Sequence, residues 1–207
     1  QTVTSSDNFG VVSSPYGAER ALKLDGAQNG SGQYVEAPTD VLDTTAPFTA
    51  EAWIKWDGSD GFRPFISKPD GSQSSGAALV VFDGELRAGL DPVGGGPTRQ
   101  VAHNAMPASE WVHVATTYNG TEQALYVNGR QVDAVSYGSE LFTVGSSQPV
   151  LIGREFLPGF LNDRTFPGQV DQVRFWSSAL SQNQIRARMH RIISPGSTEA
   201  ANLVASY

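Results

Sequence analysis

The chain of 207 residues contains no cysteine. This excludes disulfide frameworks, thiolate zinc sites and cysteine nucleophiles. Charged residues are also scarce, at 17% against a typical value of about 25%. Serine, threonine, asparagine, glutamine and glycine must therefore cover much of the surface. The longest apolar run is only a few residues, which excludes a transmembrane helix.

The charge balance is acidic, with a formal net charge of −7, and this argues against nucleic acid or an anionic membrane surface as a partner. Hydrophobic residues at 39% and aromatic residues at 10% are too many for a disordered chain. The length fits one large or two small domains. No signal peptide is visible, and we interpret Gln1 as the boundary of a mature or trimmed chain.

Short alternating segments separated by turn residues dominate the sequence. In residues 48–56, apolar side chains recur at every second position, which is typical of a half-buried strand. Asn-Gly at 119–120 and 128–129 and Asp-Gly at 83–84 predict tight hairpin turns. The other predicted strands are 21–24, 33–36, 64–67, 77–82, 85–90, 111–118, 124–127, 131–134, 150–153 and 170–176.

One short helix is predicted near the C-terminal end. Ser181 and Gln184 have the spacing of a capping box, in which each side chain bonds the backbone of the other residue. The apolar residues assigned to this helix are Leu180, Ile185, Met189 and Ile192. With ten or more strands and one helix, the sequence predicts an all-β, two-sheet antiparallel jelly-roll sandwich. No internal repeat is evident, so we expect a single domain over residues 1–193.

Eight motifs follow one another in the chain: ALKLDG (21–26), QYVE (33–36), FTAEAWI (48–54), WVHVA (111–115), LYVNG (125–129), IGR (152–154), GQVDQVR (168–174) and LS (180–181). In this order they resemble the laminin-G-like, concanavalin-A-like jelly rolls, including the pentraxins. The resemblance covers roughly residues 20–190. Residues 194–207 are interpreted as a linker or the start of a following module, with a closing strand of the sheet as the alternative.

The resemblance implies a non-catalytic carbohydrate-binding or adhesion module of a secreted or cell-surface, multidomain bacterial protein. Its expected partners are a glycan or glycoprotein and neighbouring modules of the same chain, and its expected cofactor is calcium. The alternatives are a structural spacer that binds only calcium and a protein-binding module. An enzyme is not expected, because the chain has no Glu-x-Asp-x-x-Glu pair of a retaining glucanase and no nucleophile elbow, phosphate loop or His-Glu-x-x-His.

Asp25 and Asp171 are the candidate calcium ligands, because calcium prefers carboxylate and carbonyl oxygens. The glycine-rich loop after Asp25, which includes Asn29, offers such carbonyls. In glucanase-type jelly rolls, an acid at the position of Asp171 binds a structural calcium. The alternative is that Asp25 begins a turn and that Asp171 pairs with Arg174 or with a backbone amide.

A second, pentraxin-type calcium site is implied by the resemblance. Asp70 and Glu155 match its acidic positions, but residues 156–158 replace the remaining ligands. Asn162 and Asp163 of the same loop are the candidate substitutes.

The long loop 155–168 is also the candidate ligand surface. Its residue Phe160 could stack on a sugar ring. Asn162 and Asp163 could hydrogen-bond sugar hydroxyl groups, and the planar guanidinium of Arg164 could donate hydrogen bonds to them. This set of groups suits a neutral glycan. The alternative is that the phenylalanines of the loop cap the core. Trp53 is either a ligand contact or packed beneath loops, and His113 is interpreted as structural.

Overall fold

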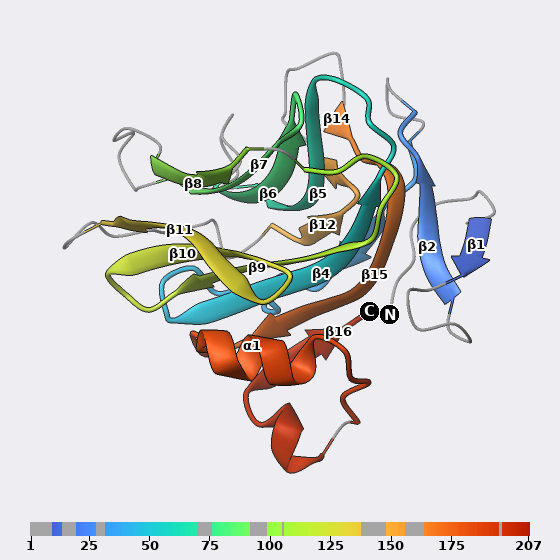
Figure 1. Cartoon of the computed structure of the whole chain (residues 1–207). Helices are drawn as coiled ribbons and strands as arrows, with labels where there is room; N and C mark the ends of the chain where they lie inside the picture. Colours follow the sequence, from blue (N-terminus) through green and yellow to red (C-terminus); the bar gives the residue numbers. More distant parts are fainter. Residues whose placement is uncertain are drawn as a thin grey trace.

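Two antiparallel β-sheets face each other in this computed structural model (Figure 1). The all-β sandwich predicted from the sequence is confirmed. The structure describes residues 10–13, 20–27, 32–69, 76–91, 99–104, 106–137, 148–155, 164–194 and 196–207. Within these residues, no helix is both long and apolar enough to cross a membrane.

Sheet A, as we name the larger sheet, carries the short helix on its outer face. In spatial order it contains β1 (Gly10–Ser13), β2 (Arg20–Asp25), β15 (Pro167–Trp176), β4 (Phe48–Trp56), β9 (Val112–Tyr118), β10 (Glu122–Val127) and β11 (Arg130–Ser136). The predicted bounds of β4 are correct. A last strand, β16 (Leu203–Ser206), pairs with the second half of β15.

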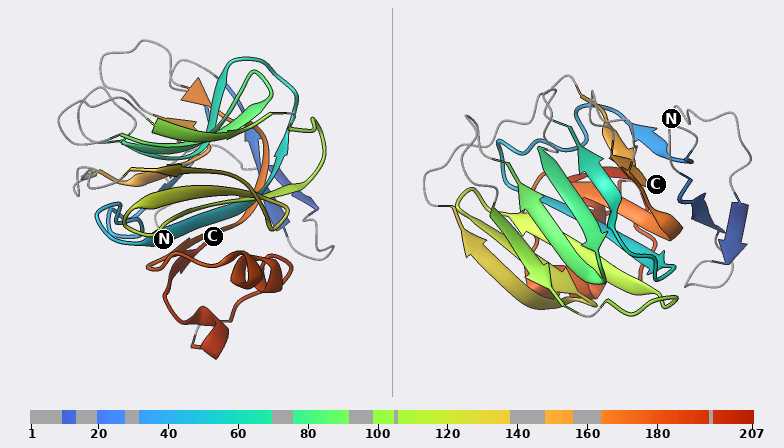
Figure 2. Two further views of the ribbon diagram at one scale, coloured as in Figure 1. Left: turned by 60° about the vertical axis from the view of Figure 1, so that its left-hand side comes forward. Right: turned by 90° about the horizontal axis from the view of Figure 1, so that it is seen from above.

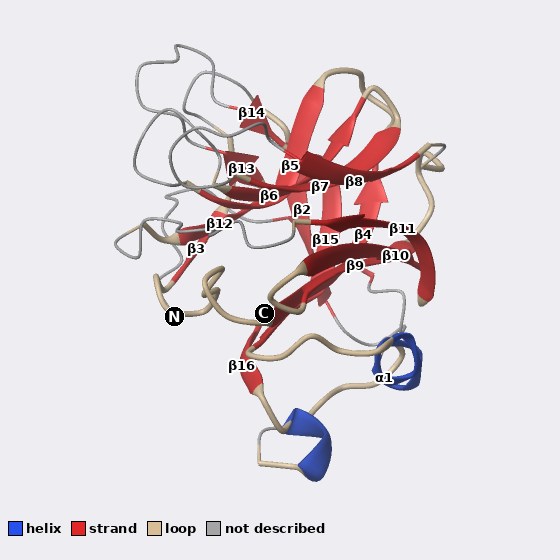
Figure 3. Ribbon diagram, turned by 90° about the vertical axis from the view of Figure 1, so that its left-hand side faces the viewer, coloured by secondary structure: helices blue, strands red, loops and turns tan. Residues whose placement is uncertain are grey.

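Sheet B, the smaller sheet, forms the other layer. In spatial order it contains β3 (Val35–Ala37), β12 (Val150–Ile152), β5 (Phe62–Lys68), β6 (Ala77–Phe82), β7 (Glu85–Leu90) and β8 (Arg99–His103). A two-stranded hairpin of β13 (Arg154–Glu155) and β14 (Arg164–Thr165) lies beside β5 and leads the chain from sheet B to sheet A. Figure 3 shows β14 on the side of sheet B that faces away from α1.

The core fills the space between the sheets with alternate side chains of both. Ile54 of β4 and Val114 of β9 meet Leu86 of β7 in one cluster, and all three are fully buried. Each such side chain contributes roughly 1.5–3 kcal/mol by leaving water. The period-two alternation in residues 48–56 placed Ile54 on the inward face correctly.

The prediction that residues 48–56 form a half-buried strand is wrong, because β4 is buried on both faces. Its outer face lies beneath α1 (Gln182–Arg188), as the left view of Figure 2 shows. The predicted capping box of Ser181 and Gln184 is present, and Ile185 is buried against the sheet. Ile192 does not continue this apolar face: the helix ends at Arg188, and Ile192 is 66% exposed.

The C-terminal residues return to sheet A after a 3-10 turn, η1 (Thr198–Ala200). The backbone groups of Tyr207 and Val173 exchange two hydrogen bonds, of 2.9 and 3.0 Å. Residues 203–206 therefore form a closing strand, which the sequence analysis gave as the alternative. The following module and the domain bounds remain predictions.

Candidate functional site

A cluster of buried polar side chains lies between sheet A and α1. Glu51 of β4 and Arg174 of β15 are 0% and 2% exposed, and His113 of β9 is 1% exposed. Glu51 Oε1 accepts a hydrogen bond from Trp176 Nε1 at 3.0 Å and lies 3.4 Å from Arg174 Nη1. Glu51 Oε2 lies 3.3 Å from His113 Nε2.

The ionised form of Glu51 is favoured in this cluster. Burial alone would raise the pKa of the carboxyl, but the neighbouring His113 and Arg174 and the hydrogen bond from Trp176 outweigh burial, so the pKa is lowered. The guanidinium of Arg174 also donates to the carbonyl oxygens of Arg188, at 3.2 Å, and Arg191. Arg188 is the last residue of α1, and Arg191 lies in the turn that follows it, where Arg191 N donates to Arg188 O at 2.9 Å. The cluster therefore fastens α1 to the sheet, and Glu51 is closed to any substrate.

Trp53 belongs to the same covered face. It is 7% exposed, its Nε1 donates to Met189 O at 2.8 Å, and His190 packs on its ring at 5.3 Å. This burial favours the alternative, packing beneath a loop, over the predicted ligand contact. His113 is structural, as predicted.

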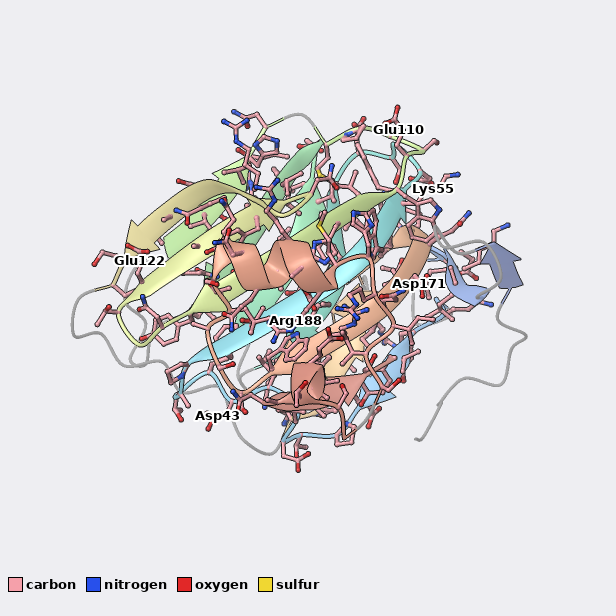
Figure 4. The ribbon with its side chains drawn as sticks, turned by 60° about the horizontal axis from the view of Figure 1, so that its bottom comes forward. Asp43, Lys55, Glu110, Glu122, Asp171 and Arg188 are labelled. Atoms are coloured by element: carbon pink, nitrogen blue, oxygen red, sulfur yellow. The ribbon has the colours of Figure 1, made fainter. Side chains whose placement is uncertain are left out.

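The structure does not bring Asp25 and Asp171 together. Asp25 of β2 pairs with Pro167 of β15, and Asp171 lies four residues further along β15. At 3.3 Å per residue, the two aspartates are therefore about 13 Å apart. Figure 4 shows Asp171 on the outer face of sheet A beside α1. Two ligands of one calcium ion lie within about 5 Å of each other, so these carboxylates do not fit a shared ion.

Each of these two carboxylates instead holds the backbone nearby. Asp25 Oδ1 accepts from the backbone N–H groups of Ala27 (3.0 Å) and Gln33 (3.3 Å). Asp171 Oδ1 accepts from Gln172 N at 2.8 Å, where a bulge interrupts the pairing with β4. In the described part of the chain, no three acidic or histidine side chains gather as metal ligands would.

The β13–β14 hairpin holds the two described candidate site residues of the loop 155–168, Glu155 and Arg164. Glu155 is 1% exposed, and its Oε2 lies 3.0 Å from Arg164 Nη1 on the facing strand. The Arg164 guanidinium also stacks over the ring of Phe62 at 4.5 Å. Phe166 at the base of the hairpin is a core residue in contact with Phe65. The predicted site residues Asn29, Asp70, Phe160, Asn162 and Asp163 lie outside the described residues.

Two pockets flank this hairpin on the outer face of sheet B. The first, which we name the Phe62 pocket, has a volume of about 150 Å³. Its floor consists of small side chains of β6 and β7, and polar groups stand at its rim. The lining residues are Phe62, Gly76, Ala78, Val80, Arg87, Gly89, Asp91 and Gln100.

The second, which we name the Tyr34 pocket, has a volume of about 230 Å³ and lies over β3 and β12. The guanidinium of Arg154 stacks over the ring of Tyr34 at 4.7 Å. A ring with a guanidinium on it offers a flat apolar surface edged with N–H donors. The lining residues are Tyr34, Glu36, Pro69, Gln148, Pro149, Leu151 and Arg154.

A larger hollow of about 420 Å³ lies at the corner of sheet A beside Lys23 and Lys55. Its aromatic residue, Trp56, is only 5% exposed and belongs to the core. Its acids act on the chain itself: besides Asp25, Asp57 accepts from Ser59 N at 2.8 Å. This hollow lacks an exposed ring face and is a weaker candidate for sugar binding than the two pockets on sheet B.

The described acids do not form a hydrolytic pair in either pocket. Asp91 lines the Phe62 pocket and Glu36 lines the Tyr34 pocket, one carboxylate in each. A glycosidase needs two carboxyl groups roughly 5–9.5 Å apart, whereas β3 and β7 are separated by three intervening strands of sheet B. The arrangement can stack and hydrogen-bond a polyhydroxylated ligand.

The residues of both pockets were not predicted from the sequence. A signal was present in the predicted strands 77–82 and 85–90, where the face opposite the core carries small residues at Ala78 and Gly89. Small side chains in adjacent strands leave a depression. The register that aligns Ala78 with Gly89 and Gln100 comes only from the structure.

The two packed antiparallel sheets have the architecture of a concanavalin-A-like jelly roll. The family model described as "Concanavalin A-like lectin/glucanases superfamily" (Laminin_G_3) matches residues 29–186. The chain belongs to this family, and the resemblance stated from the sequence motifs is confirmed. Mouse pappalysin-1 is 31% identical over 90 residues, which are 42% of this chain but only 5% of that protein.

Solved structures share the fold. A protein from Bacteroides ovatus that is proposed to bind carbohydrate is 25% identical, with a TM-score of 0.68 over 90% of this chain and 50% of that chain. A heptameric pentraxin from Limulus polyphemus is 18% identical, with a TM-score of 0.64 over 90% and 87% of the two chains. Domain 4 of an extracellular arabinanase from Geobacillus stearothermophilus, solved with arabinotriose, is 16% identical, with a TM-score of 0.59 over 88% and 81%.

Proposed function

We propose that this chain is a non-catalytic carbohydrate-binding module and that the Phe62 pocket is its principal site. The observation that carries the proposal is the combination of groups around one small-residue floor: the Phe62 ring with the Arg164 guanidinium stacked on it, the Arg87 guanidinium, the Asp91 carboxylate and the Gln100 amide. Sugars present apolar ring faces and hydroxyl groups, so they need an aromatic or flat surface together with donors and acceptors.

The similarity to other proteins supports the same class of ligand. The Bacteroides ovatus protein is proposed to bind carbohydrate, and the arabinanase domain was solved with arabinotriose. We therefore infer a glycan or glycoprotein as the partner and a secreted or cell-surface protein as the context, in which this chain serves adhesion beside neighbouring modules. The absence of a hydrolytic pair among the described acids of the two pockets supports a binding role rather than an enzymatic one.

Calcium is a separate part of the proposal. Asp25 and Asp171 are too far apart to share one ion. We therefore restrict the proposed calcium site to Asp25 and the carbonyl groups of the loop that follows, which includes Asn29. The glycan proposal does not depend on this ion, because the described residues that line the Phe62 pocket come from other elements.

A glycan array probed with the wild-type chain and with Gln100→Ala tests the function. Gln100 is exposed on β8, so its truncation should change stability by less than about 0.5 kcal/mol. We expect the wild type to bind a restricted set of glycans and Gln100→Ala to weaken that binding. Gln131→Ala, an exposed change on β11 of sheet A, is the matched control and should bind as the wild type does. Equal binding by Gln100→Ala and Gln131→Ala would contradict the assigned site.

A further inference from the structure

The two pockets of sheet B lie in a single row of residues that crosses every strand of the sheet. The row consists of directly paired residues, one from each of β3, β12, β5, β6, β7 and β8. These are Glu36, Leu151, Ser67, Ala78, Gly89 and Gln100. For each of them, at least one adjacent residue on the same strand belongs to the core, so the row faces outward. The right view of Figure 2 looks onto this layer from above.

The row is interrupted at its third residue. Ser67 is 0% exposed, and its hydroxyl donates to Arg154 O at 2.7 Å, so the chain of β13 passes over it. Leu151 on one side lines the Tyr34 pocket, and Ala78 on the other lines the Phe62 pocket. These two residues are two strand spacings apart, about 10 Å, and the outermost pair, Glu36 and Gln100, are about 24 Å apart. This span is wider than one sugar ring, so one sugar cannot fill both pockets.

Each pocket nevertheless carries a similar set of chemical groups. The Tyr34 pocket has a ring beneath a guanidinium, the acid Glu36 and the amide Gln148. The Phe62 pocket has a ring beneath the Arg164 guanidinium, the acid Asp91 and the amide Gln100. Both rings are half-buried, and both stacked guanidinium groups belong to the β13–β14 hairpin that separates the pockets.

We infer that the two pockets are two subsites for a single oligosaccharide chain, which crosses sheet B over the hairpin with Arg154 and Arg164 beneath it. This inference rests on the proposed function and adds to it the class of ligand, an extended oligosaccharide rather than a terminal monosaccharide. Two subsites joined by one ligand raise the affinity by on the order of 10²- to 10⁴-fold over one subsite when the spacing fits.

The test is a ladder of oligosaccharides titrated by calorimetry. The probes are xylo-, manno-, arabino- and gluco-oligosaccharides, each from the monosaccharide to the hexasaccharide. The proteins are the wild-type chain, Glu36→Ala in the Tyr34 pocket, Gln100→Ala in the Phe62 pocket, their double variant, and Gln131→Ala as the control. Melting curves of all five establish that they are folded.

We expect the affinity of the wild type to rise with chain length and then to level off once the chain spans both pockets. In each single variant the rise should be reduced, and in the double variant the long chains should bind no better than short ones. An affinity that is the same for short and long chains, lowered by Gln100→Ala and not by Glu36→Ala, would overturn the two-subsite inference and leave the proposed function intact. If no probe of any length binds, the proposed function fails as well.

Discussion

Replacement of Glu51 by glutamine tests the role assigned to the polar cluster beneath α1. The change keeps the size of the side chain and leaves an oxygen for the hydrogen bond from Trp176, but it removes the negative charge. Arg174 then remains 2% exposed with no carboxylate beside it at 3.4 Å. The variant therefore isolates the charge of Glu51 from its packing.

The expected loss can be estimated from the geometry. Removing one partner of a buried ion pair costs roughly 3–5 kcal/mol, and the retained hydrogen bond places Glu51→Gln near the lower limit, at about 3 kcal/mol. Arg174 keeps its bonds to Arg188 O and Arg191 O, which also limits the loss. For a chain of this length, each kcal/mol lowers the melting temperature by about 2–4 °C. We expect a decrease of roughly 6–12 °C.

Differential scanning calorimetry measures this decrease, and Glu122→Gln is the matched control. Glu122→Gln is the same chemical change on the same sheet, but Glu122 is exposed at the start of β10, where Figure 4 labels it. The control should change stability by less than about 0.5 kcal/mol. If the two variants melt at the same temperature, the cluster does not fasten α1 to the sheet and our reasoning is refuted.

The same structure supports three more predictions. The pKa of Glu51 is lowered on folding, so the stability that its charge contributes is present above the usual pKa of 4.5 and is lost as pH falls through the folded pKa. Acid should therefore lower the melting temperature of the wild type more steeply than that of Glu51→Gln, and parallel curves of melting temperature against pH would refute this. If Asp25 holds calcium, excess EDTA should remove about 2.7 kcal/mol of stability when calcium is initially at a hundredfold excess over its Kd. Asp25→Asn should abolish this effect of EDTA and Asp171→Asn should not, and a wild-type melting curve unchanged by EDTA would rule out the site. Trp53→Ala should cost roughly 3–5 kcal/mol without weakening glycan binding, and a loss of affinity at unchanged stability would restore Trp53 as a ligand contact.

The sequence predicted those parts of the fold that depend on local patterns. The alternation in residues 48–56 and the capping box of Ser181 and Gln184 each depend on neighbours in the chain, and both elements begin at the predicted residues. The short strands β13 and β14 were missed because two residues carry no periodicity. The burial of Trp53 was left open because it depends on α1, more than a hundred residues later.

The candidate site was harder to predict than the fold. Asp25 and Asp171 are acids at plausible positions in their strands, but the register of β2 and β15 separates them by about 13 Å. Conversely, Glu36 and Gln100 lie on strands at opposite edges of sheet B, and only the pairing of all six strands aligns them. Chemistry that depends on register between distant segments is not visible in a single sequence.

The central claim is that the outer face of sheet B binds glycan, and amide chemical-shift mapping by NMR tests it most directly. The measurement follows the backbone amides of the described residues as a glycan selected on the array is added to saturation. We predict that the largest shifts fall on residues around the Phe62 and Tyr34 pockets, such as Ala78, Gly89 and Glu36, while the outer face of sheet A around Lys55 and α1 is unchanged. Shifts concentrated on sheet A and α1, with sheet B unchanged, would contradict the account.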